Sequence, residues 1–160
     1  MATTKGFTLI ELVIVILLLG ILAAFAVPKW LGKGGFETHT LRDELVTRLR
    51  LVQTMNMQEG ASRCTQLVIE ATRFGHLTQL GACTGKPIAS WSPDERVRGR
   101  IVNASGSLFL SPNGAYSFDK RSGRPLVPAA CLSGCDLTVS DGQERVSLRI
   151  EPEGYIHALP

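Results

Sequence analysis

Apolar residues gather at the start of the chain, in a run of 21 positions from Phe7 to Val27 that only Thr8, Glu11 and Gly20 interrupt. A helix of that length rises about 1.5 Å per residue and would be roughly 31 Å long, close to the hydrocarbon thickness of a bilayer at about 30 Å. After Glu11 the run is apolar on every side, which disfavours a helix buried in a soluble core. We therefore expect residues 7–28 to form a transmembrane helix.

A removable secretory signal is the alternative interpretation of this run. Lys5 would be its basic region, and Ala24-Phe25-Ala26 offers small residues for cleavage, so that the mature chain would begin at Val27. The run is longer than the apolar region of such signals, and it contains a carboxylate. A charge at mid-bilayer costs roughly 2.5 to 3.5 kcal/mol, so Glu11 requires a partner or a function.

The residues around Glu11 resemble a known processing signal. Lys5-Gly6-Phe7-Thr8-Leu9-Ile10-Glu11 is similar to the class III signal of type IV pilins and pseudopilins. The resemblance covers residues 1–30. It implies that prepilin peptidase removes residues 1–6 as a leader, by cutting between Gly6 and Phe7, and that Phe7 is then N-methylated.

Cleavage there would create a new ammonium group on Phe7, one helical turn before Glu11. Burying that cation among helices is unfavourable unless a negative group meets it. Glu11 can neutralise the amine of its own or of a neighbouring subunit. In the family the partner is the neighbouring subunit, so the resemblance implies that Phe7 and Glu11 are assembly residues.

The run is followed by helix-breaking residues and then by a second helical pattern. Pro28 predicts a kink, and the glycines of the segment 29–36 predict a break or a meltable stretch that could extend under load in a filament, with a simple linker as the alternative. From 37 to 58 the apolar residues repeat with helical spacing, which predicts an amphipathic helix. Its apolar stripe contains Leu41, Leu45, Leu49, Leu51, Val52 and Met55, its solvated face contains Arg42, Asp43, Arg50 and Gln53, and Glu44 and Arg48 can pair at i, i+4.

Beyond Gly60 the pattern changes to short runs with the alternation of β-strands. These runs are Leu67 to Ile69, Val97 to Val102, Leu108 to Leu110, Tyr116 to Phe118, Leu137 to Val139 and Val146 to Ile150, and Pro152-Glu153-Gly154 can turn the last into a hairpin with Tyr155 to Leu159. A helix followed by many short strands predicts an α+β domain over residues 60–160, with the helix packed on an antiparallel sheet. The resemblance to pilins implies the same fold.

The cysteines all lie after the apolar run. Cys64, Cys83, Cys131 and Cys135 are an even number and fit disulfides in an oxidising periplasm. We favour Cys64 with Cys83 and Cys131 with Cys135, because each pair closes a local loop. A zinc site is the alternative, but the spacing does not form paired knuckles, so no metal is expected.

Composition and motifs give no sign of an enzyme. The 17 basic and 14 acidic residues give a net charge of only +3. No nucleophile motif or phosphate-binding loop is present, and His39, His76 and His157 are far apart in sequence. We expect no catalytic residues and no cofactor.

One basic segment suggests a possible anion or DNA patch. Arg96, Arg98 and Arg100 alternate with other residues, so a strand would project their guanidinium groups from one face; a solvated face partly balanced by Asp94 and Glu95 is the favoured interpretation. The stretch from Arg145 to Tyr155 is similar to the end of the FimT/GspH-like pilins, some of which carry a Gly-Arg-x-Arg motif for DNA. Here Gly154 is followed by Tyr155-Ile156-His157, both arginines are missing, and nucleic acid is not an expected partner.

The hypothesis that best fits these patterns is a minor type IV pilin-like subunit, most similar to a minor pilin of the mannose-sensitive haemagglutinin (MSHA) system. The resemblance implies the partners: prepilin peptidase, other pilin subunits, an inner-membrane assembly platform, and the membrane before assembly. It also implies a single-pass inner-membrane protein with a periplasmic domain, which later joins an extracellular pilus or a periplasmic pseudopilus. A minor pseudopilin of type II secretion and a DNA-binding uptake pilin are the alternatives.

Overall fold

The structure is a computed structural model that describes residues 8–31 and 33–160, with side chains described for 8–23 and 36–160. The chain divides into two compact units, residues 1–34 and 35–160. The first contains helix α1, Leu9–Leu31. Most of helix α2, Lys33–Gln58, belongs to the second.

The helical segments extend further than the sequence predicted. The expected break at 29–36 is largely helical, because α1 continues to Leu31 and α2 begins at Lys33, while Gly32 lies outside the described residues. A helical glycine costs about 1 kcal/mol relative to alanine, which weakens a helix without forbidding it. Pro28 lies inside α1, and the kink expected there stays a prediction.

The second unit is built from two antiparallel sheets. One has the strand order β3-β2-β1-β5-β6 and the other β4-β7-β8-β9. The strands are β1 Arg63–Glu70, β2 Arg73–Leu80, β3 Val102–Asn103, β4 Phe109–Ser111, β5 Gly114–Phe118, β6 Pro125–Val127, β7 Cys135–Ser140, β8 Arg145–Ile150 and β9 Ile156–Ala158. The short helices are the 3-10 segments η1 Ile88–Ser90 and η2 Ala129–Ser133 and the α-helix α3 Pro93–Gly99. The predicted α+β class is correct.

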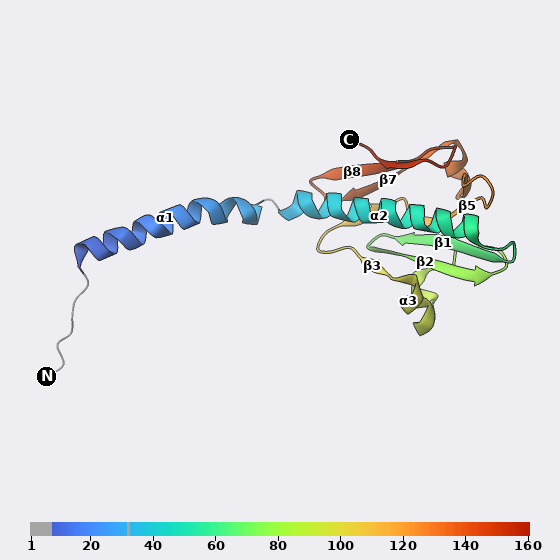
Figure 1. Cartoon of the computed structure of the whole chain (residues 1–160), viewed down its shortest axis with the longest axis horizontal. Coiled ribbons are helices and arrows are strands. Elements are labelled where there is room, and N and C mark those ends of the chain that lie inside the picture. The colour runs from blue at the N-terminus through green and yellow to red at the C-terminus, as the bar shows by residue number, and fades with distance from the viewer. Residues whose placement is uncertain (1–7, 32) are drawn as a thin grey trace. The chain divides into compact units, whose positions relative to one another are not determined.

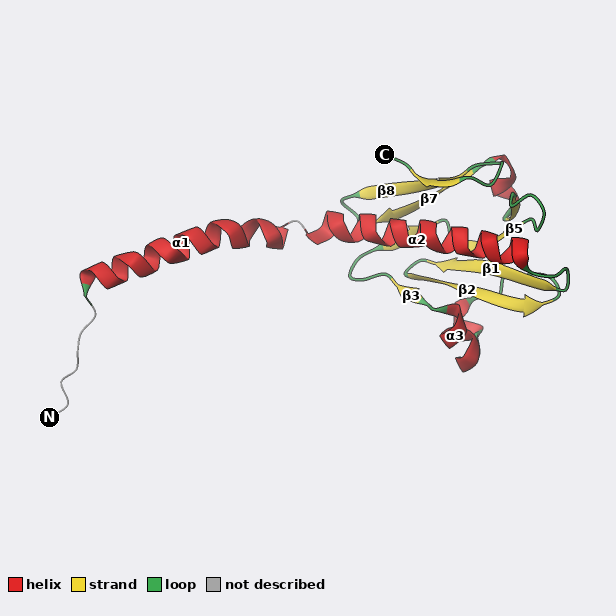
Figure 2. Ribbon diagram, viewed as in Figure 1, coloured by secondary structure: helices red, strands yellow, loops and turns green. Residues whose placement is uncertain are grey.

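Helix α2 packs on both sheets and joins them into one core. Figures 1 and 2 show it crossing the second unit with β7 and β8 on one side and β1 and β2 on the other. Leu45, Leu49 and Val52 are fully buried against side chains from both sheets, as the apolar stripe predicted. Burying each such side chain contributes roughly 1.5 to 3 kcal/mol. Among the described side chains, all buried apolar residues lie between 41 and 156, so residues 35–160 hold a complete core of their own.

The polar face predicted for α2 is only partly solvated. Arg42 Nη1 donates to the Leu159 carbonyl (3.2 Å), and Arg50 Nη2 donates to the Ile156 carbonyl (2.6 Å). Gln53 Nε2 donates to two carbonyls, those of Gly123 (2.6 Å) and Gly154 (2.7 Å). These donors thus satisfy backbone carbonyls of the C-terminal segment and of the turn before β6.

Two further predictions for α2, its apolar stripe and its ion pair, are met in part and in full, respectively. Leu51, predicted in the apolar stripe, is 40% exposed, and Met55 is half-buried. Glu44 and Arg48 form the predicted i, i+4 ion pair at 3.3 Å.

Most of the predicted strand runs are found as strands, and one is wrong. Val97 to Val102 is not a strand, because residues up to Gly99 belong to α3 and only Val102 enters β3. The predicted C-terminal hairpin is present, with β8 paired to β9. Strands β2 and β6 were not predicted; β2 alternates too weakly, and β6 is three residues long.

Both disulfides follow the pairing that the sequence favoured. Cys64, in β1, is joined to Cys83, which follows β2. Cys131, in η2, is joined to Cys135 at the start of β7. The two bonds close loops at separate places in the second unit.

Candidate functional site

The processing signal begins outside the described residues, which exclude both Gly6 and Phe7. The first described residue, Thr8, directly precedes α1, and its hydroxyl accepts a hydrogen bond from the Glu11 N–H (3.4 Å). The same hydroxyl donates weakly to Glu11 Oε2 (3.5 Å). Thr8 therefore caps the helix, a role that its spacing of three residues from a glutamate could have indicated.

The Glu11 carboxylate is exposed, and among the described residues its one hydrogen bond is the weak contact with Thr8. It lies in the first turn of α1, where a negative charge is favoured by the free N–H groups of the helix. An exposed carboxylate at this place is geometrically able to meet a cation from another molecule.

The first half of α1 presents apolar side chains in every direction. All described side chains from residue 8 to 23 are exposed, among them Leu9 (82%), Ile10 (64%) and Leu22 (64%). Across residues 8–31 and 33–160, no helix combines the length and the apolar character needed to cross a membrane.

The segment containing Arg96, Arg98 and Arg100 folds as a short helix because of the residues before it. Ser92 caps α3 by accepting from the Glu95 N–H (3.3 Å), and Glu95 Oε2 accepts from the Ser92 N–H (2.6 Å), while Pro93 occupies the first helical position. This capping box is a stronger local signal than the alternation of arginines that predicted a strand.

The three arginines consequently do not share a strand face. Arg96 is used structurally: its Nε donates to the Trp91 carbonyl (3.1 Å) and its Nη2 to the Ala89 carbonyl (2.8 Å). Arg98 lies in the last turn of α3, and Arg100 caps the helix in the left-handed conformation with φ 44°. The predicted row of guanidinium groups is therefore wrong.

Helix α3 lies close against β2 because two glycines face each other there. A Cβ on Gly75 would lie 3.2 Å from the Gly99 carbonyl oxygen, and a Cβ on Gly99 would lie 2.7 Å from the His76 carbonyl oxygen. The Trp91 ring, which is buried, fills the remaining space beside both glycines. This close approach places the residues on either side of Gly99 near His76.

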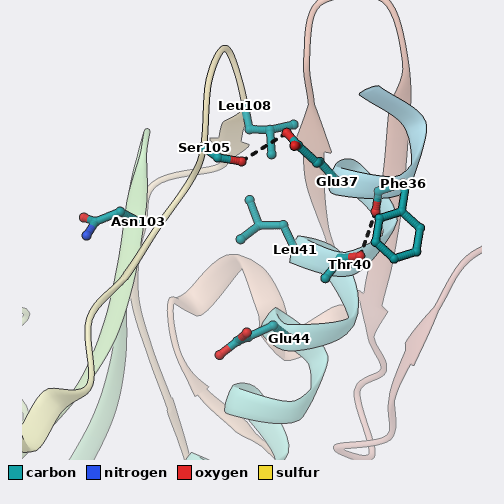
Figure 3. Close-up of a pocket in the computed structure, with 8 residues that line it drawn as sticks. All are labelled: Phe36, Glu37, Thr40, Leu41, Glu44, Asn103, Ser105 and Leu108. Atoms are coloured by element: carbon teal, nitrogen blue, oxygen red, sulfur yellow. Dashed lines mark hydrogen bonds between the residues drawn. The ribbon is translucent and has the colours of Figure 1, made fainter. Parts of the chain in front are cut away.

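A pocket of about 150 Å³ lies between the start of α2 and the loop after β3 (Figure 3). Leu41 and Leu108 form its apolar wall, and Glu37 Oε2 accepts from Ser105 Oγ at 3.1 Å. Phe36 lines the outer side and is 76% exposed. The two hydroxyls of the lining are already used within the chain, because Thr40 Oγ1 donates to the Phe36 carbonyl (2.7 Å) and Ser105 Oγ to Glu37.

The histidines do not gather into a site. His39 Nε2 lies 3.5 Å from Glu144, His157 Nε2 lies 3.1 Å from Glu151, and His76 belongs to β2. Within the described part of the chain no three His, Cys, Asp or Glu side chains are placed to hold a metal ion.

Comparison with known proteins agrees with the N-terminal signal and with the fold. Residues 1–27 match the family model for the prokaryotic N-terminal methylation motif. The type IV major fimbrial protein FimA of Dichelobacter nodosus is 28% identical over 142 residues, which are 87% of this chain and 68% of FimA. FimA of strain VCS1703A is 26% identical over 155 residues, covering 92% of this chain and 73% of FimA.

Among solved structures, the type IV minor pilin FimU of Pseudomonas aeruginosa PAO1 has a similar fold. Its crystal structure in space group P21 superposes with a TM-score of 0.53 at 11% identity, over 78% of this chain and 89% of FimU. A second crystal form gives a TM-score of 0.51 at 11% identity, over 76% and 92%. The chain is thus similar to proteins with the N-terminal methylation motif over its first 27 residues, to type IV fimbrial proteins along most of its length, and to a type IV minor pilin in its fold.

Proposed function

We propose that this protein is a minor subunit of a bacterial type IV pilus of the MSHA type, which assembles through its N-terminal helix and serves pilus biogenesis and adhesion. One observation supports the proposal above the others: Glu11 is an exposed carboxylate at the start of a helix whose other described side chains are almost all apolar and exposed. Exposing so many apolar side chains to water is unfavourable, and placing the Glu11 charge in lipid is costly.

Leader removal would give this carboxylate its partner. Cutting between Gly6 and Phe7 frees an ammonium group, and methylation of Phe7 leaves that group positively charged. In a bundle of pilin helices, the amine of one subunit and Glu11 of its neighbour would attract each other, and this attraction would offset the cost of removing both charges from water. The pairing also fixes the axial position of each new subunit, because a displaced subunit would bury two unpaired charges.

The helix would exchange one apolar environment for another. Before assembly, residues 7–28 would hold the subunit in the inner membrane as a single span, with residues 35–160 in the periplasm. On extraction, the same side chains would pack against other pilin helices. The disulfides Cys64–Cys83 and Cys131–Cys135 support the periplasmic side, since disulfides persist in oxidising compartments.

A minor pseudopilin of type II secretion uses the same N-terminal chemistry and is the second candidate. Purification of the protein from its own cells distinguishes the two, because a pilin is recovered with sheared filaments and a pseudopilin with the secretion platform. The DNA-uptake alternative loses its original basis, because it depended on arginines aligned along a strand and the segment is helical.

Mass spectrometry of the protein isolated from cells tests the processing step. We expect the mature chain to begin at Phe7 and to carry one N-terminal methyl group. A chain that retains residues 1–6, or one that begins at Val27 after signal-peptidase cleavage, would contradict the proposal.

Substitution of Glu11 tests the assembly step separately. Glu11→Ala should leave membrane insertion and leader cleavage intact but remove the subunit from sheared filaments. Ile10→Ala is the matched control, because it shortens a neighbouring exposed side chain without removing the charge, and it should be incorporated. Normal incorporation of a correctly processed Glu11→Ala protein would refute the role assigned to the carboxylate.

A further inference from the structure

The sheet β4-β7-β8-β9 carries a pocket of about 280 Å³ near the turn that joins β7 to β8. Three adjacent strands contribute to it, because β4 lies beside β7 and β7 lies beside β8. Its lining consists of Phe109, Ser111, Thr138, Ser140, Gly142 and Arg145. The pocket belongs to residues 35–160 alone, so it is independent of helix α1 and of the proposed assembly step.

The strand register brings these side chains together on the face of the sheet that points away from the core. Phe109 is paired with Ser140, and Ser140 is paired with Arg145. The residues that follow or precede them along each strand are buried in the core: Leu110, Val139 and Val146. Since successive residues of a strand point to opposite faces, the residues that line the pocket point outward.

Phe109 gives the pocket an apolar surface that the chain itself leaves uncovered. It is 54% exposed, whereas Leu110, the next residue of β4, is only 3% exposed. Covering an exposed aromatic ring removes apolar area from water and is favourable. A ligand that has an apolar face of its own would gain from lying against this ring.

The polar part of the lining keeps the capacity to form hydrogen bonds. Among the described residues, neither the Ser111 hydroxyl nor the Arg145 guanidinium forms a hydrogen bond or an ion pair. The Thr138 and Ser147 hydroxyls share one hydrogen bond at 3.3 Å, and Thr138 can still accept another whichever of the two donates. The pocket therefore offers both donors and acceptors beside the ring of Phe109.

No carboxylate lines this pocket within residues 36–160, whose side chains are described. Two acidic residues lie in or beside the turn between β7 and β8, but both accept hydrogen bonds within the chain. Glu144 Oε2 accepts from the Thr38 hydroxyl of α2 (3.0 Å), and Asp141 Oδ1 accepts from the Glu144 N–H (2.7 Å). The Arg145 guanidinium is thus left to donate to the oxygens of a ligand.

We propose that this pocket binds a neutral saccharide, with the apolar face of a pyranose ring against Phe109 and the ring hydroxyls on Arg145 and Ser111. The C–H groups of a pyranose form an apolar face, while its hydroxyls lie around the edge and both donate and accept. The planar guanidinium can donate to two adjacent oxygens at once. The volume suits a short saccharide, because it lies near the lower end of the range of about 300 to 1,000 Å³ that is typical of small-molecule sites.

NMR titration of residues 35–160, which contain the whole described core and both disulfides, tests the proposal. The probes are the methyl glycosides of glucose, galactose, mannose and N-acetylglucosamine. With at least one of them we expect saturable shifts, at millimolar concentration, of the amides of Phe109, Ser111, Thr138 and Arg145. Glycerol has hydroxyls but no ring face, and sodium acetate offers only a charge to Arg145, so neither should cause saturable shifts there.

The outcomes that would overturn the proposal are distinct from those that concern the pilus. Absence of saturable shifts with every glycoside, or equal shifts with glycerol or acetate, would exclude a saccharide site. Because the titration uses residues 35–160 without α1, such a failure would leave the proposed assembly function untouched. Loss of assembly in the Glu11→Ala protein would likewise leave this site untouched.

Variants separate a built site from general adhesiveness. Phe109→Leu keeps an apolar side chain without the ring, and Arg145→Gln removes the charged donor, so each should weaken binding about tenfold. Phe36→Leu is the control for the ring, because Phe36 is 76% exposed but lines another pocket. Arg121→Gln, at the turn between β5 and β6, is the control for charge. Both controls should bind like the wild type.

The two test variants do not depend on each other. Arg145 is exposed, so Arg145→Gln should stay folded even where Phe109→Leu does not. Unchanged affinity in a folded Arg145→Gln protein, or equal weakening by the control variants, would contradict the site.

Discussion

Asn56 in α2 and Thr65 in β1 exchange two hydrogen bonds through the Asn56 side chain. Asn56 Nδ2 donates to the Thr65 carbonyl (2.6 Å), and the Thr65 N–H donates to Asn56 Oδ1 (3.1 Å). Strand β5 pairs with β1 only from Leu67 to Ile69, so Thr65 lies beyond the end of that ladder. The side-chain amide thus replaces a strand partner and fixes the end of the helix to the start of the sheet.

Replacement of Asn56 should reveal the cost of leaving this strand end unpaired. Both residues are buried, at 1% and 0% exposure. Asn56→Leu removes a donor and an acceptor and leaves the Thr65 N–H and carbonyl without partners, so we expect residues 35–160 to lose roughly 2 to 4 kcal/mol of unfolding free energy. Urea denaturation measures this loss. The control is Thr54→Ala, whose exposed hydroxyl donates only to the Arg50 carbonyl in the same helix. A loss no greater than that of Thr54→Ala would contradict the assignment.

The turn at Gly154 offers a prediction with a closely matched control. Gly154 has φ +94°, and a Cβ there would collide with the Gly123 carbonyl group and lie 2.9 Å from Gln53 Nε2. Gly142 has nearly the same φ, +91°, but a Cβ there would meet nothing within 4 Å. Gly142→Ala should therefore cost only backbone strain, about 1 kcal/mol, whereas Gly154→Ala should cost clearly more, because it also separates the two carbonyls that Gln53 bridges. Equal urea midpoints for the two variants would show that the close approach of Gly154 to the Gly123 carbonyl does not contribute to stability.

Sequence patterns were sufficient for the parts of the fold in which one local rule dominates. The helical spacing of Leu45, Leu49 and Val52 predicted the buried stripe, and the local loops predicted both disulfides. The patterns failed at residues 97–102, where alternating arginines imitate a strand. The stronger evidence there was Ser92 with Glu95 three residues later, a capping box that starts a helix.

The polar contacts of helix α2 were harder to predict, because they join residues that are far apart in the chain. Gln53 is 70 residues from Gly123, and Arg50 is 106 residues from Ile156. Periodicity shows only that such side chains lie off the apolar stripe, so it assigned them to solvent. The surroundings of His76 likewise depend on the close approach of Gly75 and Gly99, which neither glycine indicates by itself.

The surroundings of His76 lead to a prediction about pH. Burial and the nearby Arg48 and Arg100 lower its pKa from the ordinary value of 6.5, while Glu95, which lines a pocket together with His76, is paired with Lys86. As the pH falls below 6.5, the unfolded chain binds a proton at this histidine that the folded chain does not. The contribution of His76 to stability is therefore complete above pH 6.5 and decreases as the pH falls through the lowered folded-state pKa.

Comparison of variants isolates this effect. The unfolding free energy of wild-type residues 35–160, measured in urea from pH 7.5 to pH 5, should decrease more steeply than that of His76→Gln. The control His39→Gln changes an exposed histidine. Its unfolding free energy should decrease with falling pH as steeply as that of the wild type. Parallel curves for the wild type and His76→Gln would show that the imidazole titrates alike in both states.

The disulfide between Cys64 and Cys83 should stabilise the second unit mainly by restricting the unfolded chain. The two cysteines are 19 residues apart, and closing a loop of that length is worth roughly 3 kcal/mol in the chain-entropy model. The Cys64→Ala/Cys83→Ala double variant should lose about that much in urea under oxidising conditions. After reduction, the wild type and the double variant should unfold at nearly the same urea concentration, because the covalent link is then absent from both. A difference that persists after reduction would mean that the side chains themselves, rather than the closed loop, provide the stability.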